Sequence, residues 1–171
     1  MYNKILVAVD RTKLSRQALT QAIAIAKAFQ ATLHLLHVLT PLEQEYKVTP
    51  LAFSHSSYLE SLDGVIREQW QSLEEAGLKM LRSHCAEVQQ AGVKCESTQT
   101  IGQPDRKICE LAQTWNADLI VIGSHGRKGL RELVLGSVSN YVSHHVPCAV
   151  LIVHQQADSQ SLPQEQPKTA P

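Results

Sequence analysis

Residues 117–137 read ADLIVIGSHGRKGLRELVLGS, an apolar run followed at once by a glycine-rich turn. Half of the chain's eight glycines lie in this stretch, at positions 123, 126, 129 and 136. A short apolar run bounded by glycine is typical of a strand buried on both faces of a parallel sheet. Glycine lets the backbone approach a ligand closely and point successive N–H groups at phosphate oxygens. The stretch therefore predicts a buried strand and an anion-binding turn, with a plain turn as the alternative.

Apolar runs of this kind alternate with helical stripes along most of the chain. Strands are expected at residues 4–9, 31–39, 93–101, 117–123 and 148–153. Helices are expected at 15–30 with Ser15 as N-cap, at about 58–91 with Gly64 as a candidate early break, at 104–115 starting on Pro104, and at 137–146. The alternation predicts one doubly wound α/β domain over residues 1–154, with a five-stranded parallel sheet and helices on both faces.

The charges of the chain balance, with 16 Lys plus Arg against 16 Asp plus Glu in 171 residues. Such a balance gives no general attraction to nucleic acid or to an anionic membrane, so neither is expected as a partner. No apolar run approaches the roughly 20 residues that a membrane helix needs. The N-terminus lacks the pattern of a secretory signal peptide, and a cytoplasmic protein is expected.

The four cysteines, at positions 85, 95, 109 and 148, form no CxxC pair and have no histidine at metal-ligand spacing. Because cytosolic disulfides are uncommon, four reduced structural thiols are expected. His34 and His37 are three apart in a strand and should point to opposite faces, so they are not a ligand pair. No metal site formed by side chains is expected.

Two segments have no clear hydrophobic period. Residues 40–57 form a long connection with two prolines, for which a lid and a surface for a protein partner are both candidate roles. Residues 155–171 are rich in Gln and Pro and contain Leu162 as the one large aliphatic residue. Such a segment cannot bury enough apolar surface to order itself, and a disordered tail is expected.

The candidate ligand site lies where two strands end. Asp10 and Thr12 follow the first strand, and the 123–137 turn follows the fourth. In open parallel sheets, ligands bind beyond the carboxyl ends of strands, at the point where the strand order reverses. If the order is 3-2-1-4-5, these two turns face each other across one crevice. Basic residues at 127, 128 and 131 make the glycine-rich turn locally positive.

The spacing Gly123-x2-Gly126-x9-Gly136-Ser137 resembles the nucleotide-binding signature of the universal stress protein family, in its ATP-binding branch. Other segments resemble the same family in the same order: KILVAVD at the start, LHLLHV in the second strand, GQPDRKI at a helix start and VPCAVLIV in the last strand. The similarity covers about residues 1–154. It implies a Rossmann-like fold of the adenine-nucleotide alpha-hydrolase type, with the strand order 3-2-1-4-5.

The resemblance also implies how ATP, or AMP or ADP, would bind, with Mg²⁺ held by the nucleotide phosphates. The ribose and phosphates would lie against Gly123, Gly126, Gly136 and Ser137, with Arg127 and Val138 beside them. The backbone of Val38 would meet the adenine, and Asp10 and Thr12 would lie under the nucleotide. Where the family often has D-G-S, this chain has Asp10-Arg11-Thr12, which keeps a hydroxyl but adds a bulky cation. Family members commonly form homodimers through the last strand, here 148–153.

Efficient phosphoryl transfer needs metal ligands and a residue that orients the nucleophile, and the sequence offers few suitable carboxylates. We therefore expect a nucleotide-dependent regulatory protein of the stress response, with no catalytic residue assigned and slow ATP hydrolysis left open. The alternative is a dimeric interaction module in which nucleotide is absent or incidental.

Overall fold

A computed structural model describes residues 1–40, 56–124 and 136–154, with the backbone alone for residues 56–66. The strands are β1 (Lys4–Ala8), β2 (Thr32–Leu39), β3 (Lys94–Ile101), β4 (Leu119–Gly123) and β5 (Ala149–Val153). The helices are α1 (Lys13–Phe29), α2 (Ser56–Gln90), α3 (Pro104–Thr114) and α4 (Ser137–His145). Among the described residues, no helix combines the length and the apolar character that crossing a membrane requires.

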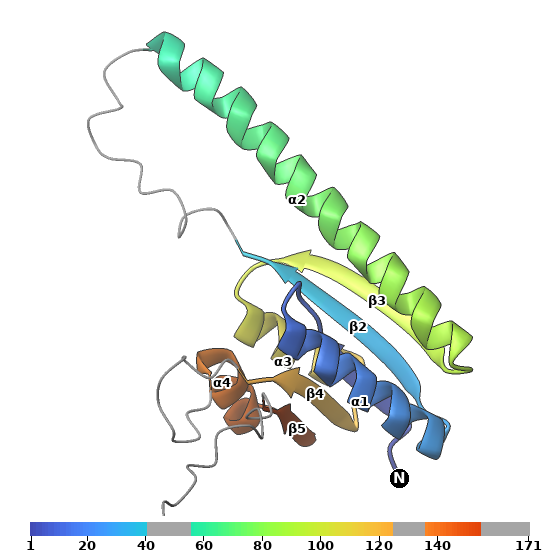
Figure 1. Cartoon of the computed structure of the whole chain (residues 1–171). Helices are drawn as coiled ribbons and strands as arrows, with labels where there is room; N and C mark the ends of the chain where they lie inside the picture. Colours follow the sequence, from blue (N-terminus) through green and yellow to red (C-terminus); the bar gives the residue numbers. More distant parts are fainter. Residues whose placement is uncertain (41–55, 125–135, 155–171) are drawn as a thin grey trace, which may run out of the picture.

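All five strands form one parallel sheet in the order β3-β2-β1-β4-β5 (Figure 1). This confirms the expected fold and strand order. The sequence runs β1-β2-β3 to one side and then returns to β4-β5 on the other, so the order reverses between β1 and β4. The edge character expected for residues 93–101 is also confirmed, because β3 is an outer strand of the described sheet.

The side chains of β1 show how the sheet separates two apolar cores. Ile5 and Val7 belong to the core under α1 and α2, whereas Leu6 belongs to the core under α3 and α4, and all three are fully buried. Successive side chains of a strand point to opposite faces, so a strand covered on both sides must be apolar throughout. Covering helices on both faces, as expected, therefore explain the unbroken apolar runs of β1 and β4.

Helix α1 begins earlier than expected, because its N-cap is Thr12 and not Ser15. The Thr12 hydroxyl accepts a hydrogen bond from the Ser15 N–H at 3.1 Å, as a capping threonine does. Ser15 lies in the first turn, where its buried hydroxyl accepts the Asp10 N–H at 2.8 Å. The start of α1 is thus tied to the end of β1 by side chains of its own first turn.

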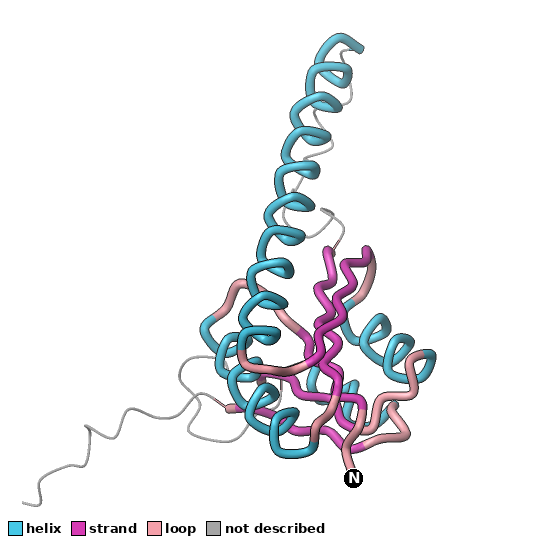
Figure 2. Tube along the Cα trace, turned by 90° about the vertical axis from the view of Figure 1, so that its right-hand side faces the viewer, coloured by secondary structure: helices cyan, strands magenta, loops and turns pink. Residues whose placement is uncertain are grey.

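Helix α2 runs unbroken for 35 residues, so the expectation of an early break at Gly64 is wrong. At about 1.5 Å per residue it is roughly 50 Å long. Figures 1 and 2 show its N-terminal part projecting well beyond the sheet, while its C-terminal part lies over β2 and β3. Within that C-terminal part, Gly77, Leu81 and Val88 are buried. Gly92 follows the helix with a positive φ of 81°, as expected for a residue that ends a helix.

The expectation of four reduced thiols is wrong for two of them, because Cys85 of α2 and Cys95 of β3 form a disulfide. Cys109 and Cys148 are free. The ten-residue spacing belongs to no recognised cysteine motif, so the sequence carried no signal for the pair. The fold brings the two residues together because α2 ends at Gln90 and β3 returns beside it from Lys94.

Glycine at position 77 lets α2 approach the sheet closely. A Cβ there would overlap Gln99 Oε1 and lie 2.6 Å from His37 Nδ1. These two side chains are themselves paired, with His37 Nδ1 3.0 Å from Gln99 Oε1, and Gln99 Nε2 donates to the Glu74 carbonyl at 3.0 Å. The close packing of α2 on the sheet therefore depends on the absence of a side chain at position 77 and on the hydrogen-bonded side chains of His37 and Gln99 beneath the helix.

We predict that Gly77→Ala lowers the free energy of unfolding by about 1–2 kcal/mol, because displacing His37 and Gln99 outweighs the roughly 1 kcal/mol that alanine gains in helix propensity. Urea unfolding measures the change. His37→Ala removes the ring that the new methyl group meets, so Gly77→Ala should cost clearly less in that background. An equal cost in both backgrounds would contradict the packing account.

The carboxylate of Asp118 anchors the N-terminus of the chain beside the start of β4. Its Oδ2 accepts the N–H groups of Asn3 and Lys4 at 2.8 and 2.9 Å. These two backbone hydrogen bonds hold the pKa of Asp118 below its ordinary value of 3.8. The charged carboxylate is therefore favoured in the folded protein.

The pKa of Asp118 is lower in the folded protein than in the unfolded chain. Asp118 therefore contributes fully to the free energy of unfolding at a pH above its unfolded-state pKa, and this contribution is lost as the pH falls through its folded-state pKa. We predict that Asp118→Ala costs about 1 kcal/mol at pH 7 and progressively less below about pH 4. Denaturant midpoints of the two proteins across pH 2.5–7 measure this. Asp118→Asn keeps an acceptor without the charge and should give an intermediate loss at pH 7. A gap that stays constant down to the lowest pH would refute the assignment.

Candidate functional site

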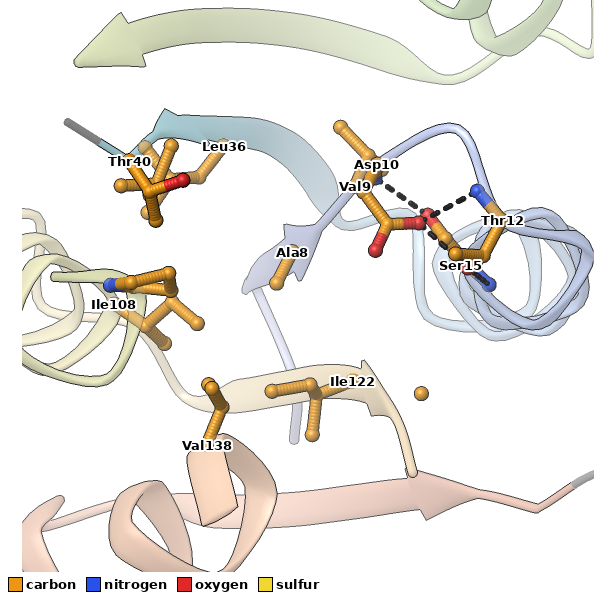
Figure 3. Close-up of a pocket in the computed structure, with 13 residues that line it drawn as sticks. Ala8, Val9, Asp10, Thr12, Ser15, Leu36, Thr40, Ile108, Ile122 and Val138 are labelled. Atoms are coloured by element: carbon orange, nitrogen blue, oxygen red, sulfur yellow. Dashed lines mark hydrogen bonds between the residues drawn. The ribbon is translucent and has the colours of Figure 1, made fainter. Parts of the chain in front are cut away.

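An open crevice of about 290 Å³ lies at the carboxyl ends of β1, β2 and β4, between the starts of α1, α3 and α4 (Figure 3). It is lined by Ala8, Val9, Asp10, Thr12, Ser15, Leu36, Val38, Thr40, Pro104, Ile108, Ile122, Gly123 and Val138. The crevice lies where the strand order reverses between β1 and β4, which is where ligands bind in open parallel sheets.

The walls of the crevice differ in chemistry. Leu36, Val38, Ile108, Ile122 and Val138 give it apolar sides that come from β2, α3, β4 and α4. Figure 3 shows the polar side chains of Asp10, Thr12 and Ser15 gathered at one end, with Thr40 at the other. An apolar slot with a few polar groups at its ends suits a ligand with a flat hydrophobic part and a polar part.

Asp10 is held in place by its own loop. Its Oδ1 accepts the N–H of Thr12 at 2.8 Å and the Thr12 hydroxyl at 2.6 Å, while its own N–H donates to Ser15 Oγ at 2.8 Å. Because Oδ1 takes both bonds, Oδ2 has no hydrogen-bond partner among the described residues. The network leaves one carboxylate oxygen available to a ligand and fixes the orientation of the other.

Val38 offers its backbone to the crevice because β1 is shorter than β2. The pairing of the two strands ends at Ala8 and Leu36, with one further bond from the Val9 N–H to the Leu36 carbonyl at 2.9 Å. Val38 lies two residues after Leu36, so its backbone N–H and C=O point in the same direction as those of Leu36, towards the β1 side. At the level of Val38 the described β1 strand has already ended. On the other side, Leu39 accepts the Gly102 N–H at 2.9 Å. Val38 therefore carries a backbone donor and acceptor beside the apolar slot.

Three of the predicted residues lie at the start of α4. Gly136 is the N-cap, Ser137 is the first helical residue, and Val138 lines the crevice. The first N–H groups of a helix have no partner within it, and they carry partial positive charge. This end of α4 therefore places a set of N–H donors next to the apolar slot.

Gly123 lines the crevice, but a second constraint also requires a small residue there. A Cβ on Gly123 would lie 2.9 Å from Leu14 Cγ of α1. Its missing side chain thus makes room for α1, which the sequence interpretation did not anticipate. Gly126 and Arg127 lie outside the described residues.

Sequence reasoning missed much of the apolar lining, above all Leu36, Ile108 and Ile122. These residues look like ordinary core positions of two strands and a helix, and each is almost fully buried. Only the topology shows that they border the crevice. Thr40 was also missed. It directly follows β2, and the sequence interpretation assigned it to the long connection 40–57.

The histidines of the sheet behave as expected, since His34 and His37 lie on opposite faces. His34 Nε2 is 2.8 Å from Thr98 Oγ1 and its ring packs edge-on against Trp115, whereas His37 lies under α2. Burial lowers the pKa of His34, against the opposing effect of the Glu96 carboxylate. Within the described residues, no group of three or more His, Cys, Asp or Glu side chains is arranged to hold a metal ion.

Solved structures with the same fold include proteins with bound nucleotides. A universal stress protein in complex with cAMP is 24% identical, with a TM-score of 0.62 and coverage of 91% of this chain and 99% of that one. A family protein from Arabidopsis thaliana with AMP bound is 23% identical, with a TM-score of 0.62 and coverage of 91% and 93%. At these identities the likeness shows the fold.

Closer similarity extends along nearly the whole chain. Universal stress protein Sll1388 from Synechocystis sp. is 38% identical over 152 residues, which cover 89% of this chain and 97% of the relative. The solved structure of MJ0577 from Methanocaldococcus jannaschii is 26% identical, with a TM-score of 0.72 and coverage of 92% of this chain and 99% of that one. The sequence profile of the universal stress protein family matches residues 1–154. The chain belongs to the universal stress protein family.

Proposed function

We propose that the crevice binds an adenine nucleotide, with ATP as the expected ligand and AMP and ADP as the other candidates. The observation that carries the proposal is the backbone of Val38, which lies beyond the end of the β1 pairing and beside an apolar slot. A backbone N–H and C=O side by side match the donor and acceptor on the edge of adenine. The apolar side chains of Leu36, Ile108, Ile122 and Val138 would then enclose the faces of the base. The AMP and cAMP complexes of solved relatives support the choice of adenine.

The ribose and phosphates would extend from the slot along the ends of β1 and β4. The free Oδ2 of Asp10 suits a ribose hydroxyl, which can donate to it. The start of α4, at Gly136 and Ser137, suits a phosphate group, because its N–H donors and partial positive charge favour anions. Gly126 and Arg127 continue this proposed phosphate site by their place in the sequence between Gly123 and α4.

Mg²⁺ would be bound chiefly by the phosphates rather than by a cage of side chains. Asp10 is the one carboxylate in the described lining of the crevice, and one of its oxygens already holds Thr12. Magnesium commonly binds through one or two carboxylates and the substrate phosphates, so these residues are compatible with a metal–nucleotide complex. The metal would supply charge neutralisation for the phosphates there.

A regulatory role in the stress response, rather than rapid catalysis, fits this set of residues. Fast phosphoryl transfer requires several positioned groups around the metal and the nucleophile. The described crevice offers Asp10 and hydroxyl groups, with no histidine among its lining residues. We propose that bound nucleotide changes how the protein interacts with partners in the cytoplasm. A homodimer would form through 148–153, whose β5 is an outer strand of the described sheet.

We predict that the purified protein binds ATP and that Gly136→Val weakens binding at least tenfold, which is about 1.4 kcal/mol. The φ of −60° and ψ of 155° at Gly136 suit valine, so the substitution adds a branched side chain at the proposed phosphate site without backbone strain. Isothermal titration with Mg-ATP measures the affinity. Ion-exchange chromatography with mass detection, applied to the supernatant of denatured protein, identifies any nucleotide that copurifies.

His144→Val is the matched control, because it places the same side chain on an exposed position at the far end of α4. It should leave affinity unchanged, and thermal melting should show both variants folded. If wild-type protein carries no nucleotide and melts identically with and without Mg-ATP, the proposal is wrong and the protein is an interaction module without nucleotide.

We predict that steady-state ATP hydrolysis, followed by phosphate release with saturating Mg-ATP, is well below the usual enzyme range of about 1–10³ per second. The reason is the sparse set of catalytic groups around Asp10. Turnover within that range would contradict a regulatory role based on binding alone. Asp10→Asn distinguishes true turnover from a contaminating ATPase, since a contaminant would be unaffected by this substitution.

A further inference from the structure

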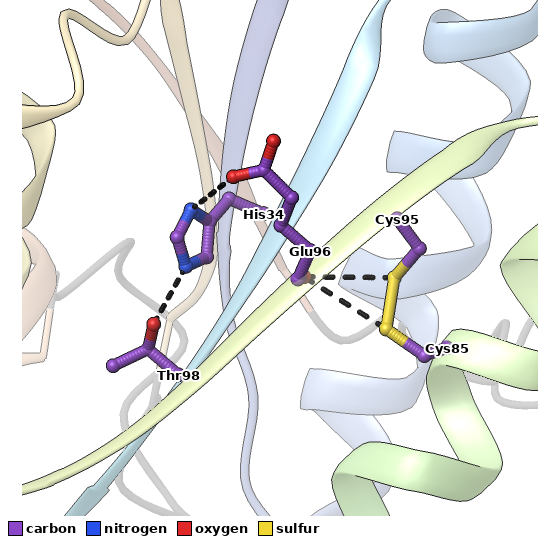
Figure 4. The surroundings of a disulfide bond; sticks show 5 residues. All are labelled: His34, Cys85, Cys95, Glu96 and Thr98. Atoms are coloured by element: carbon purple, nitrogen blue, oxygen red, sulfur yellow. Dashed lines mark hydrogen bonds and ion pairs between the residues drawn. A yellow bond between two sulfur atoms is a disulfide. The ribbon is translucent and has the colours of Figure 1, made fainter.

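The disulfide joins two elements at the opposite end of the sheet from the crevice. Cys85 lies in the last turns of α2, and Cys95 is the second residue of β3 (Figure 4). Their Cα atoms are 5.6 Å apart, within the range that a disulfide spans. Both side chains are half-buried, and β3 is an outer strand of the described sheet. The pair therefore lies near the surface.

The fold holds these two residues together without help from the covalent bond. The turn between them is closed by backbone hydrogen bonds from the Gly92 N–H to the Gln89 carbonyl at 2.9 Å and from the Val93 N–H to the Val88 carbonyl at 3.1 Å. Beyond the turn, β3 pairs with β2 along its whole length, and Val88 and Val93 are buried in the core. Breaking the disulfide would leave all of these interactions in place.

The reduced pair would also have a hydrogen-bond acceptor. The carbonyl oxygen of Glu96 lies 3.8 Å from Cys85 Sγ and 3.6 Å from Cys95 Sγ. A thiol is a weak donor, and a carbonyl at these distances can accept from it. Both redox states are therefore compatible with the same backbone arrangement.

We propose that Cys85 and Cys95 form a reversible thiol–disulfide site, closed by exchange with a low-molecular-weight disulfide such as oxidised glutathione. The thiolate of one cysteine attacks a sulfur of the small disulfide and releases one thiol. The second cysteine then attacks the mixed disulfide, forms the Cys85–Cys95 bond and releases the second thiol. The protein pair loses two electrons and two protons, and the small disulfide becomes two thiols.

The other two cysteines are poorly suited to the same reaction. Burial raises the pKa of Cys109, and the Asp105 carboxylate raises it further. Burial likewise raises the pKa of Cys148, with a smaller contribution from Asp118. Less thiolate forms at each, and the thiolate is the reactive species. Among the cysteines, which all lie in the described residues, Cys85 and Cys95 are the two that the fold brings to bonding distance, so the exchange is assigned to this pair.

Closing the bond would fix the end of α2 to β3 and, through α2, to α1. Arg16 of α1 contacts α2 close to Cys85, with Nη1 2.6 Å from Glu87 Oε2 and 3.1 Å from His84 Nδ1. The projecting N-terminal part of α2 is continuous with this anchored end. Oxidation state thus controls how firmly the long helix is attached, whether or not the crevice binds a nucleotide.

The experiment incubates the full chain in glutathione buffers from fully reduced to fully oxidised and counts free thiols with a maleimide reagent under denaturing conditions. Four reactive thiols per chain are expected after reduction and two after oxidation, with an intramolecular bond located by peptide mass mapping. Far-UV circular dichroism should not change between the two states. The melting temperature of the oxidised form should be higher by roughly 5–10 °C.

Two variants provide controls. Cys109→Ser with Cys148→Ser keeps the pair and should lose both remaining thiols on oxidation, whereas Cys85→Ser should gain no intramolecular bond and no rise in melting temperature. The proposal is overturned if the pair remains as two thiols in oxidised glutathione, or if each cysteine stops at a mixed disulfide. It is also overturned if reduction unfolds the protein, because the bond would then be a permanent structural one.

Discussion

The early end of β1 is the constraint on which the crevice depends. β1 stops at Ala8 while β2 continues to Leu39, because the chain turns away at Asp10 into the cap of α1. The turn is held by the hydrogen bonds among Asp10, Thr12 and Ser15. Had β1 continued, it would have paired with Val38 and filled the space between β2 and β4. The same short loop therefore ends a strand, begins a helix and exposes the backbone of a neighbouring strand.

Much of this architecture could be predicted from the sequence, because buried parallel strands and amphipathic helices leave strong patterns. The unbroken apolar runs at 4–9 and 117–123 reflect a sheet covered on both faces, and the strand order followed from the family resemblance. The position of Asp10, Thr12 and Gly123 at one edge then followed from the rule that ligands bind at the carboxyl ends of parallel strands, and the family resemblance added Val38. Their placement around one crevice is confirmed, while their contacts with a ligand remain a proposal.

Other features have no local pattern and needed three-dimensional coordinates. The N-cap of α1 was misplaced at Ser15 because the apolar stripe begins only at Ala18, whereas Thr12 caps through a hydroxyl that also binds Asp10. The Cys85–Cys95 disulfide depends on where β3 returns along α2, which the ten-residue spacing does not reveal. Ile108 and Ile122 look like core residues in any sequence window, and they border the crevice only because α3 and β4 end beside it. Gly64 failed to break α2, since one glycine costs a helix only about 1 kcal/mol.

The two ends of the sheet therefore have separate chemistry. At the carboxyl ends, strands of unequal length leave backbone groups and the start of α4 open to a ligand. At the amino end of β3, a half-buried pair of sulfur atoms joins the sheet to α2, with the fully paired strands β2 and β3 between the two places. The two strands form a stiff connection, because they pair with each other at every position from Thr32 and Lys94 to Leu39 and Ile101. A change at the disulfide should thus act on the attachment of α2 itself, while the crevice keeps the shape that the end of β1 gives it.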